Sequence, residues 1–122
     1  MPHVVIEGVT DLSAFAAGWM PFVVRQGGDI LRADQLFLAK DARACLIDSL
    51  CVEAGRKQPF YTRLALHDGG NVTVRVDPMT HPERSEGVRA LIAHVGARLL
   101  RATPSGRLGA TNLVLPAIDR EP

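Results

Sequence analysis

Apolar and polar residues alternate most regularly in the middle of the chain. Within residues 60–67, Thr62, Leu64 and Leu66 occupy every second position and alternate with Arg63 and His67. Side chains of a strand point to its two faces in turn, so this pattern predicts a strand with one buried face. The stretch Asp68-Gly69-Gly70-Asn71 predicts a hairpin turn, and residues 72–76 alternate again as the returning strand.

The first quarter of the chain predicts a strand followed by a helix. Residues 3–7 are mostly apolar, which is typical of a buried strand. From about residue 11 to about residue 26, apolar side chains recur at helical spacing, at Leu12, Phe15, Ala16, Trp19 and Val23. Pro21 is expected to kink this helix or to mark a boundary within it, and Gly27-Gly28 to end it. A connector with room for a short strand follows.

The rest of the pattern predicts a strand, a second helix and a last strand. Residues 42–53 are rich in apolar residues without a helical stripe, which favours a strand that ends in a turn at residues 54–59. The sequence Thr80-His81-Pro82-Glu83 matches a capping box and predicts the start of a long helix. That helix is expected to end near residues 103–106, and residues 110–115 predict a strand.

These elements predict the fold class α+β in a single domain, residues 1–122. The order divides into two β-α-β halves, the pseudo-repeats 1–57 and 58–122. Two such units with right-handed crossovers predict a four-stranded mixed sheet with both helices on one face. The other face would then be uncovered and apolar, so we expect the chain to oligomerise.

Composition and charge exclude several classes of protein. The net charge of +1 leaves no electrostatic surface for nucleic acid or an anionic membrane. No apolar stretch is long enough to span a bilayer, and no leader peptide is recognised, so a soluble cytoplasmic protein is expected. Cys45 and Cys51 lie about 20 Å apart if residues 42–53 form a strand, too far for a disulfide, so both are expected to be reduced and buried.

The start of the chain, Met1-Pro2, carries the strongest indication of chemistry. Initiator methionine is normally removed before a small residue, and removal would leave Pro2 as a free secondary amine at the tip of a strand. An α-amine titrates much closer to neutrality than a lysine does. Cationic neighbours or burial would favour its neutral form, so Pro2 could serve as a general base.

The Met-Pro-His start and the Leu-Ala pair followed by arginine at 38–43, together with the order of elements, resemble the tautomerase superfamily. Within it the chain is most similar to 5-carboxymethyl-2-hydroxymuconate isomerase. The resemblance implies a homotrimer without metal or organic cofactor. It also implies an isomerase of aromatic-compound degradation, which moves a proton across a carboxylated dienol by keto-enol tautomerisation. Pro2 would be the base, and Arg43 would bind a substrate carboxylate.

The chain departs from this pattern at the cationic positions. Only Arg43 stands where the isomerase tends to carry two arginines, and the turn after residue 67 has no arginine. Arg63 or Arg75, on either side of that turn, would have to replace it. Of the aromatic residues, which are expected mainly in the core or an interface, Phe60 is the candidate for a wall of the substrate site.

Two other functions stay open at this point. The chain could be a non-catalytic oligomeric binding or structural module that keeps the scaffold without the site, and a retained Met1 would favour this reading. It could instead use Pro2 as an acid in another reaction on an unsaturated acid, such as hydration or dehalogenation. No nucleotide loop, metal-ligand spacing or nucleophile motif is present in the sequence.

Overall fold

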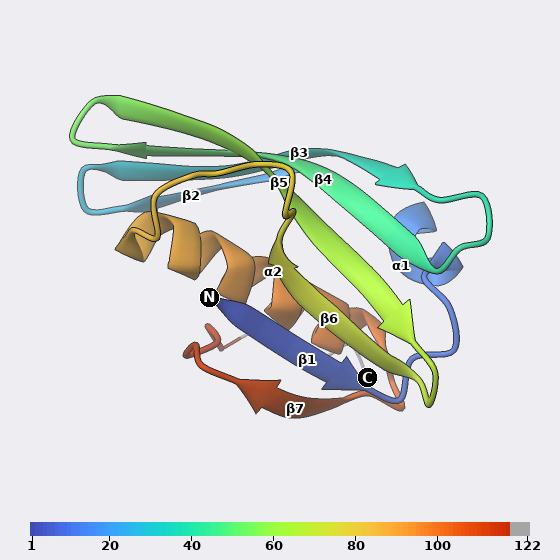
Figure 1. Cartoon of the computed structure of the whole chain (residues 1–122). Helices are drawn as coiled ribbons and strands as arrows, with labels where there is room; N and C mark the ends of the chain where they lie inside the picture. Colours follow the sequence, from blue (N-terminus) through green and yellow to red (C-terminus); the bar gives the residue numbers. More distant parts are fainter. Residues whose placement is uncertain (118–122) are drawn as a thin grey trace.

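The computed structural model describes residues 1–117 and consists mostly of strands (Figure 1). In chain order its elements are β1 (His3–Glu7), α1 (Ser13–Ala17), β2 (Phe22–Gln26), β3 (Asp29–Leu38), β4 (Ala44–Glu53), β5 (Arg56–His67), β6 (Asn71–Val76), α2 (Glu86–Ala102) and β7 (Arg107–Thr111). Within the described residues, neither helix has the length and apolar character needed to cross a bilayer.

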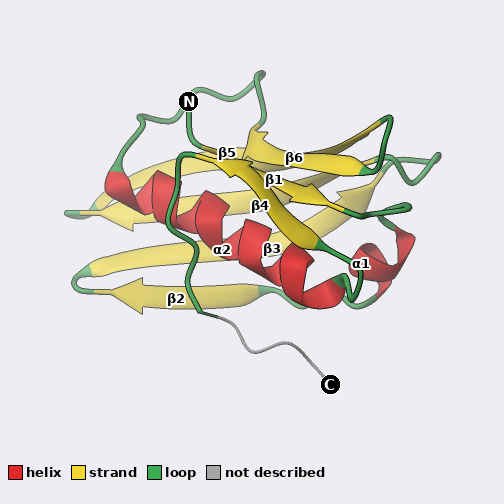
Figure 2. Cartoon of the chain, turned by 90° about the horizontal axis from the view of Figure 1, so that it is seen from below, coloured by secondary structure: helices red, strands yellow, loops and turns green. Residues whose placement is uncertain are grey.

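The strands form one curled antiparallel sheet that surrounds α2 on one side. Within residues 1–117 the sheet has seven strands in the order β2-β3-β4-β5-β6-β1-β7. Strands β2 to β6 are joined in sequence order, and β1 then pairs with β6 on one side and with β7 on the other. Figures 1 and 2 show α2 lying along the inner face, with α1 near one end of it.

The core lies between the inner face of the sheet and α2. Along β5 buried and more exposed residues alternate, as expected for a strand with one covered face. The buried face of α2 supplies large apolar side chains, among them Val88, Leu91, Ile92, Val95 and Leu99. This helical stripe and the inner positions of the strands therefore bury each other, and α2 depends on the sheet for its stability.

A glycine allows α2 to approach β1 closely. A Cβ atom added at Gly96 would lie 3.0 Å from one methyl carbon of Val4 and 3.1 Å from two further atoms of that side chain. Val4 is fully buried and sits between β6 and β7, opposite Val74 and Thr111. The strand cannot move aside without disturbing pairing on both sides, so the helix requires glycine at this crossing.

The long helix begins at a different residue from the one predicted. The sequence predicts a capping box at residues 80–83, but the N-cap is Ser85, whose hydroxyl accepts a hydrogen bond from Val88 N at 3.2 Å. Glu53 at the end of β4 accepts from the Ser85 hydroxyl and from Gly87 N, the latter at 3.0 Å. Burial raises the pKa of Glu53, but these hydrogen bonds outweigh it and hold that pKa below its usual value. The helix start is thus determined by a tertiary contact.

The predicted fold class is wrong. The chain does not form a four-stranded mixed sheet of two β-α-β units, because every strand pair described is antiparallel and the sheet has seven strands. The boundary expected between residues 57 and 58 falls inside β5. After α1 the chain crosses to the far edge of the sheet, where β2 lies, instead of returning beside β1. The pseudo-symmetry of the two halves therefore has no counterpart in this architecture.

The predicted helix at residues 11–26 is also wrong over most of its length. Only Ser13–Ala17 is helical, and Gly18 ends the helix by donating its N–H to Ala14 O at 3.0 Å. Residues 22–26 form β2, and Gly27-Gly28 is the two-residue turn of the β2–β3 hairpin, with Gln26 opposite Asp29. Pro21 separates the two elements, since it cannot continue the helical hydrogen bonding.

Several local predictions are confirmed. Residues 3–7 form β1, residues 60–67 lie in β5, and the turn before Asn71 leads into β6. The prediction for the two cysteines is also confirmed, since both are free and buried. Burial raises the pKa of Cys45 to about 11 and, together with the carboxylate of Glu53, that of Cys51 to about 12. Both thiols therefore stay protonated near neutral pH and are poor nucleophiles.

Candidate functional site

Pro2 and Arg75, two of the residues singled out in the sequence, line the same hollow. This N-terminal hollow has a volume of about 320 Å³ and lies where β1 begins and β6 ends. It is also lined by Asp77, His81 and Arg84 from the segment between β6 and α2. Pro2 is buried there beneath Met1, and the residue after it, His3, pairs with Arg75 across the β1–β6 ladder.

The charges around the N-terminal hollow have both signs. Arg75 and Arg63 lie directly opposite each other on β6 and β5, an arrangement in which like charges repel. The Nε of Arg75 donates to Val76 O at 3.4 Å. The side chain of Arg63 has no hydrogen bond or ion pair within residues 1–117, and it does not line the hollow. Asp77 is 8% exposed and brings a carboxyl group to the same wall. The hollow can therefore accept an anion at Arg75 and Arg84, opposed in part by Asp77.

Arg43 and Phe60 lie away from this hollow. Arg43 contacts the β5–β6 turn, where its Nη2 lies 3.4 Å from Asp68 Oδ1 and donates to Leu66 O at 3.3 Å. That turn is beside the end of β1, so the length of the strand, roughly 16 Å for five residues, separates Arg43 from Pro2. Phe60 points to the inner face and is 3% exposed, so it is a core residue.

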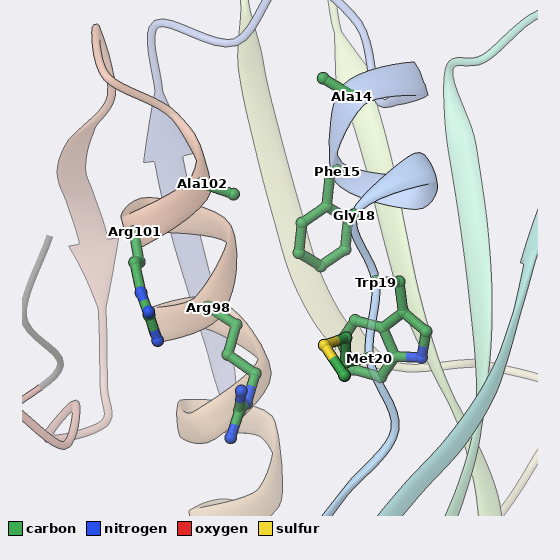
Figure 3. Close-up of a pocket in the computed structure, with 8 residues that line it drawn as sticks. All are labelled: Ala14, Phe15, Gly18, Trp19, Met20, Arg98, Arg101 and Ala102. Carbon is green, nitrogen blue, oxygen red and sulfur yellow. The ribbon is translucent and has the colours of Figure 1, made fainter. Parts of the chain in front are cut away.

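A more apolar hollow lies between α1 and the second half of α2 (Figure 3). This α1–α2 hollow has a volume of about 270 Å³. One side is made by Ala14, Phe15, Gly18, Trp19 and Met20, and the other by Arg98, Arg101 and Ala102. The two sides are about 80 residues apart in the sequence and meet because α1 packs near the end of α2.

The aromatic side of the α1–α2 hollow is held in place by contacts with its neighbours. The ring centroids of Phe15 and Trp19 are 5.6 Å apart, and those of Trp19 and Phe22 are 5.8 Å apart. The indole Nε1 of Trp19 donates to the main-chain oxygen of Asp34 on β3 at 2.7 Å. Because three aromatic rings support one another and the indole is tied to the sheet, this wall is rigid.

Positive charge gathers on the α2 side of this hollow. The Cζ of Arg98 lies 3.9 Å from the centroid of the Phe22 ring, in position for a cation–π interaction. Burial, together with the positive charge of Arg101, lowers the pKa of Arg98. His94 lies one turn earlier, and burial and then Arg98 lower its pKa. A cation is therefore held against aromatic rings beside an apolar hollow.

Two series of residues in the sequence correspond to the two sides of this hollow, one basic and one aromatic. His94, Arg98 and Arg101 recur at spacings of four and three residues, which puts them on one face of a helix. Phe15, Trp19 and Phe22 form a second series. Neither series identifies a site alone, because nothing in the sequence states that the two segments meet.

The comparisons with known proteins leave the site to be interpreted from its own geometry. No protein-family description, no curated protein and no solved structure gives a significant match to this chain. Within residues 1–117, no three histidine, cysteine, aspartate or glutamate side chains are grouped as ligands for a metal ion.

Proposed function

We propose that this protein binds a small apolar molecule in the α1–α2 hollow. The observation that carries the proposal is a concave site of about 270 Å³ walled by fixed aromatic rings and open beside α2. Ligand sites in proteins are typically concave, mostly apolar and lined by a few polar groups, and this volume lies just below their usual range of about 300–1,000 Å³. A single- or double-ring molecule suits it.

The exposed parts of the wall support the same function. Met20 borders the hollow and is 74% exposed, so its side chain is available to contact a bound molecule. A bound molecule would cover it, and the flexible thioether can adjust to the shape of a ligand. Burial of this side chain and of ligand carbon atoms would provide the driving force for binding.

Isothermal titration calorimetry with 2-naphthoate and 2-naphthylmethanol tests this proposal. We expect saturable binding of at least one compound to the wild-type chain. Ala14→Trp should fill the hollow and abolish that binding, because Ala14 lines it. Ala17→Trp is the matched control, since Ala17 is also exposed on α1 but does not line the hollow. Lack of binding of both compounds, or equal binding by the two variants, would contradict the proposal.

A second candidate function is the isomerase suggested by the start of the chain, and the shared N-terminal hollow of Pro2 and Arg75 favours it. It requires removal of Met1. The Pro2 amine would take the proton of the substrate 2-hydroxyl group, so that the O–H electrons form the carbonyl. The double bonds would shift, and the distal carbon would receive a proton from the Pro2 ammonium group. Arg75, in place of Arg43, would bind a substrate carboxylate.

Ultraviolet-monitored ketonisation of 2-hydroxymuconate tests the isomerase, with protein whose intact mass confirms the loss of Met1. We expect Pro2→Ala to lower kcat and Arg75→Ala mainly to raise KM. Arg32→Ala is the control, because Arg32 forms an ion pair with Asp34 on β3 and does not line the hollow. If Arg43→Ala were the variant that lost activity, or if Met1-free protein showed no turnover, this assignment would be wrong.

Both functions fit a cytoplasmic location, which we propose for this chain. Two free buried thiols are typical of proteins from a reducing compartment.

A further inference from the structure

The guanidinium group of Arg98 is incompletely satisfied in the α1–α2 hollow. Its Nε atom is buried and has no hydrogen-bond partner within residues 1–117. One planar face of the group is occupied by the ring of Phe22, with 3.9 Å between Cζ and the ring centroid. A buried donor without an acceptor is unfavourable, and most such groups in proteins have a partner. The protein therefore maintains a donor for which the described residues supply no acceptor.

The described lining of the α1–α2 hollow is basic and apolar. None of the residues that line the hollow is acidic within the described part of the chain. The nearest acidic residue tied to the wall, Asp34, binds Trp19 through its main-chain oxygen, and its carboxylate pairs with Arg32 at 3.5 Å. Arg101 adds a second positive charge from α2. The charged side chains that the described residues bring to the hollow are therefore both basic, and both come from α2.

We propose that the ligand of the α1–α2 hollow is an aromatic or alicyclic monocarboxylate whose carboxylate binds Arg98. This inference rests on the proposed binding function and specifies the ligand class. The apolar ring lies against Phe15, Trp19 and Met20, and the carboxylate lies against α2, so the two halves of the ligand match the two sides seen in Figure 3.

The geometry of Arg98 favours a carboxylate over a neutral polar group. With the face of the guanidinium on Phe22, its edge remains for hydrogen bonding. A carboxylate accepts two parallel N–H bonds from the two terminal Nη atoms at such an edge, since Nε is buried, and these charge-assisted bonds are roughly twice as strong as neutral ones. An alcohol accepts one weaker bond and leaves the positive charge uncompensated. The site should therefore discriminate between ligands of the same shape by charge.

The test compares 2-naphthoate with 2-naphthylmethanol, which share the ring system and differ in the polar group. Dissociation constants are measured by calorimetry for the wild type, Arg98→Gln, Arg98→Lys and Arg89→Gln. Arg89 is the control, because it lies on α2 outside the hollow and donates to Asn112 O at 3.2 Å. Circular dichroism checks the fold of each variant, and Arg98→Lys provides a second variant should Arg98→Gln not fold.

We expect the wild type and Arg89→Gln to bind naphthoate at least about tenfold more tightly than the alcohol. Arg98→Gln should bring this ratio close to one, and Arg98→Lys should restore part of it, because lysine keeps the charge and loses the paired geometry. Equal affinities of the two compounds for the wild type would overturn this inference and leave the binding function standing. If neither compound bound, both this inference and the proposed binding function would be wrong. If the ratio of the two affinities were unchanged in Arg98→Gln, Arg98 would not be the residue that binds the carboxylate.

Discussion

Replacing Arg98 with methionine should stabilise the ligand-free protein although it removes a residue of the proposed site. Methionine keeps an unbranched chain of similar length against Phe22 and leaves no donor to satisfy. In the wild type, the buried Nε has no acceptor within residues 1–117, and Arg101 stands one turn away with the same charge. A residue kept for a ligand is expected to be unfavourable when the ligand is absent.

Three effects determine the change in the free energy of unfolding: two stabilise the variant and one destabilises it. Removal of an unsatisfied buried donor is worth about 1–3 kcal/mol. Loss of the cation–π contact with Phe22, at 3.9 Å, takes away about 0.5–1 kcal/mol. Relief of the repulsion from Arg101 adds about 0.2–0.5 kcal/mol, and arginine and methionine have similar helix propensities. The net expectation is a gain of about 1.5 kcal/mol in the free energy of unfolding.

Urea denaturation followed by the fluorescence of Trp19, the single tryptophan of the chain, measures this gain. With an m-value of about 2 kcal/mol/M, the midpoint should rise by about 0.7 M. Arg89→Met is the control and should be neutral or slightly destabilising, because it loses the hydrogen bond to Asn112 O. If Arg98→Met unfolded about 1 kcal/mol more easily than the wild type, the reasoning that makes Arg98 an unsatisfied group would be refuted.

Three further predictions concern the fold and the assembly. Gly96→Ala should destabilise by about 1 kcal/mol in urea, because the new Cβ would press on the fixed side chain of Val4 at 3.0 Å; unchanged stability would show that β1 can yield. The pKa of Glu53 is lowered in the folded state. Its carboxylate therefore adds to the free energy of unfolding above the unfolded-state pKa, and this stabilisation is lost as the pH falls through the folded-state pKa. The unfolding free energies of the wild type and Glu53→Gln should thus differ at pH 7 and converge in acid, and a constant difference would contradict this. The homotrimer remains a prediction: if copies meet at the outer face of the sheet, where Phe37 is 52% exposed opposite Leu46, Phe37→Asp should give a smaller species in size-exclusion chromatography with light scattering, whereas a wild-type monomer would refute it.

The sequence predicts those elements of the fold that depend on short-range pattern. The strand at residues 60–67, its turn and the returning strand at 72–76 were predicted because alternation and turn residues lie next to one another in the chain. The end of α2 near Thr103 was predicted for the same reason, since Pro104 cannot continue the helix.

The wrong predictions arise in two situations. In one, a helical spacing of apolar residues continues into a segment that is a strand. In the other, a residue far away in the sequence determines where an element begins. Trp19 and Val23 continue a helical spacing from Leu12, yet Trp19 is part of a wall and Val23 is 52% exposed on an edge strand. The start of α2 depends on Glu53, which is 33 residues before Glu86 in the sequence. The order of the strands could not be predicted from the sequence either, because it depends on the pairing of β1 with β6.

The site was accessible to sequence reasoning only in part. The chemistry of its amine points to Pro2, and Arg75 is a candidate cation; the two line one hollow. Arg43 is implied only by a resemblance that included a fold the chain does not have, and it lies at the other end of β1. Nothing in the sequence alone indicates Arg98, because its role depends on contact between segments that are far apart in the sequence.

The two candidate sites lie toward opposite ends of α2, which makes their tests independent. Val88 lines the N-terminal hollow and Arg98 the α1–α2 hollow, and at about 1.5 Å per residue they are about 15 Å apart along the helix. Variants at Arg75 should leave naphthoate binding unchanged, and variants at Arg98 should leave any turnover at Pro2 unchanged. A substitution that altered both would indicate a change in the packing of α2 against the sheet, because that helix is the element the two hollows share.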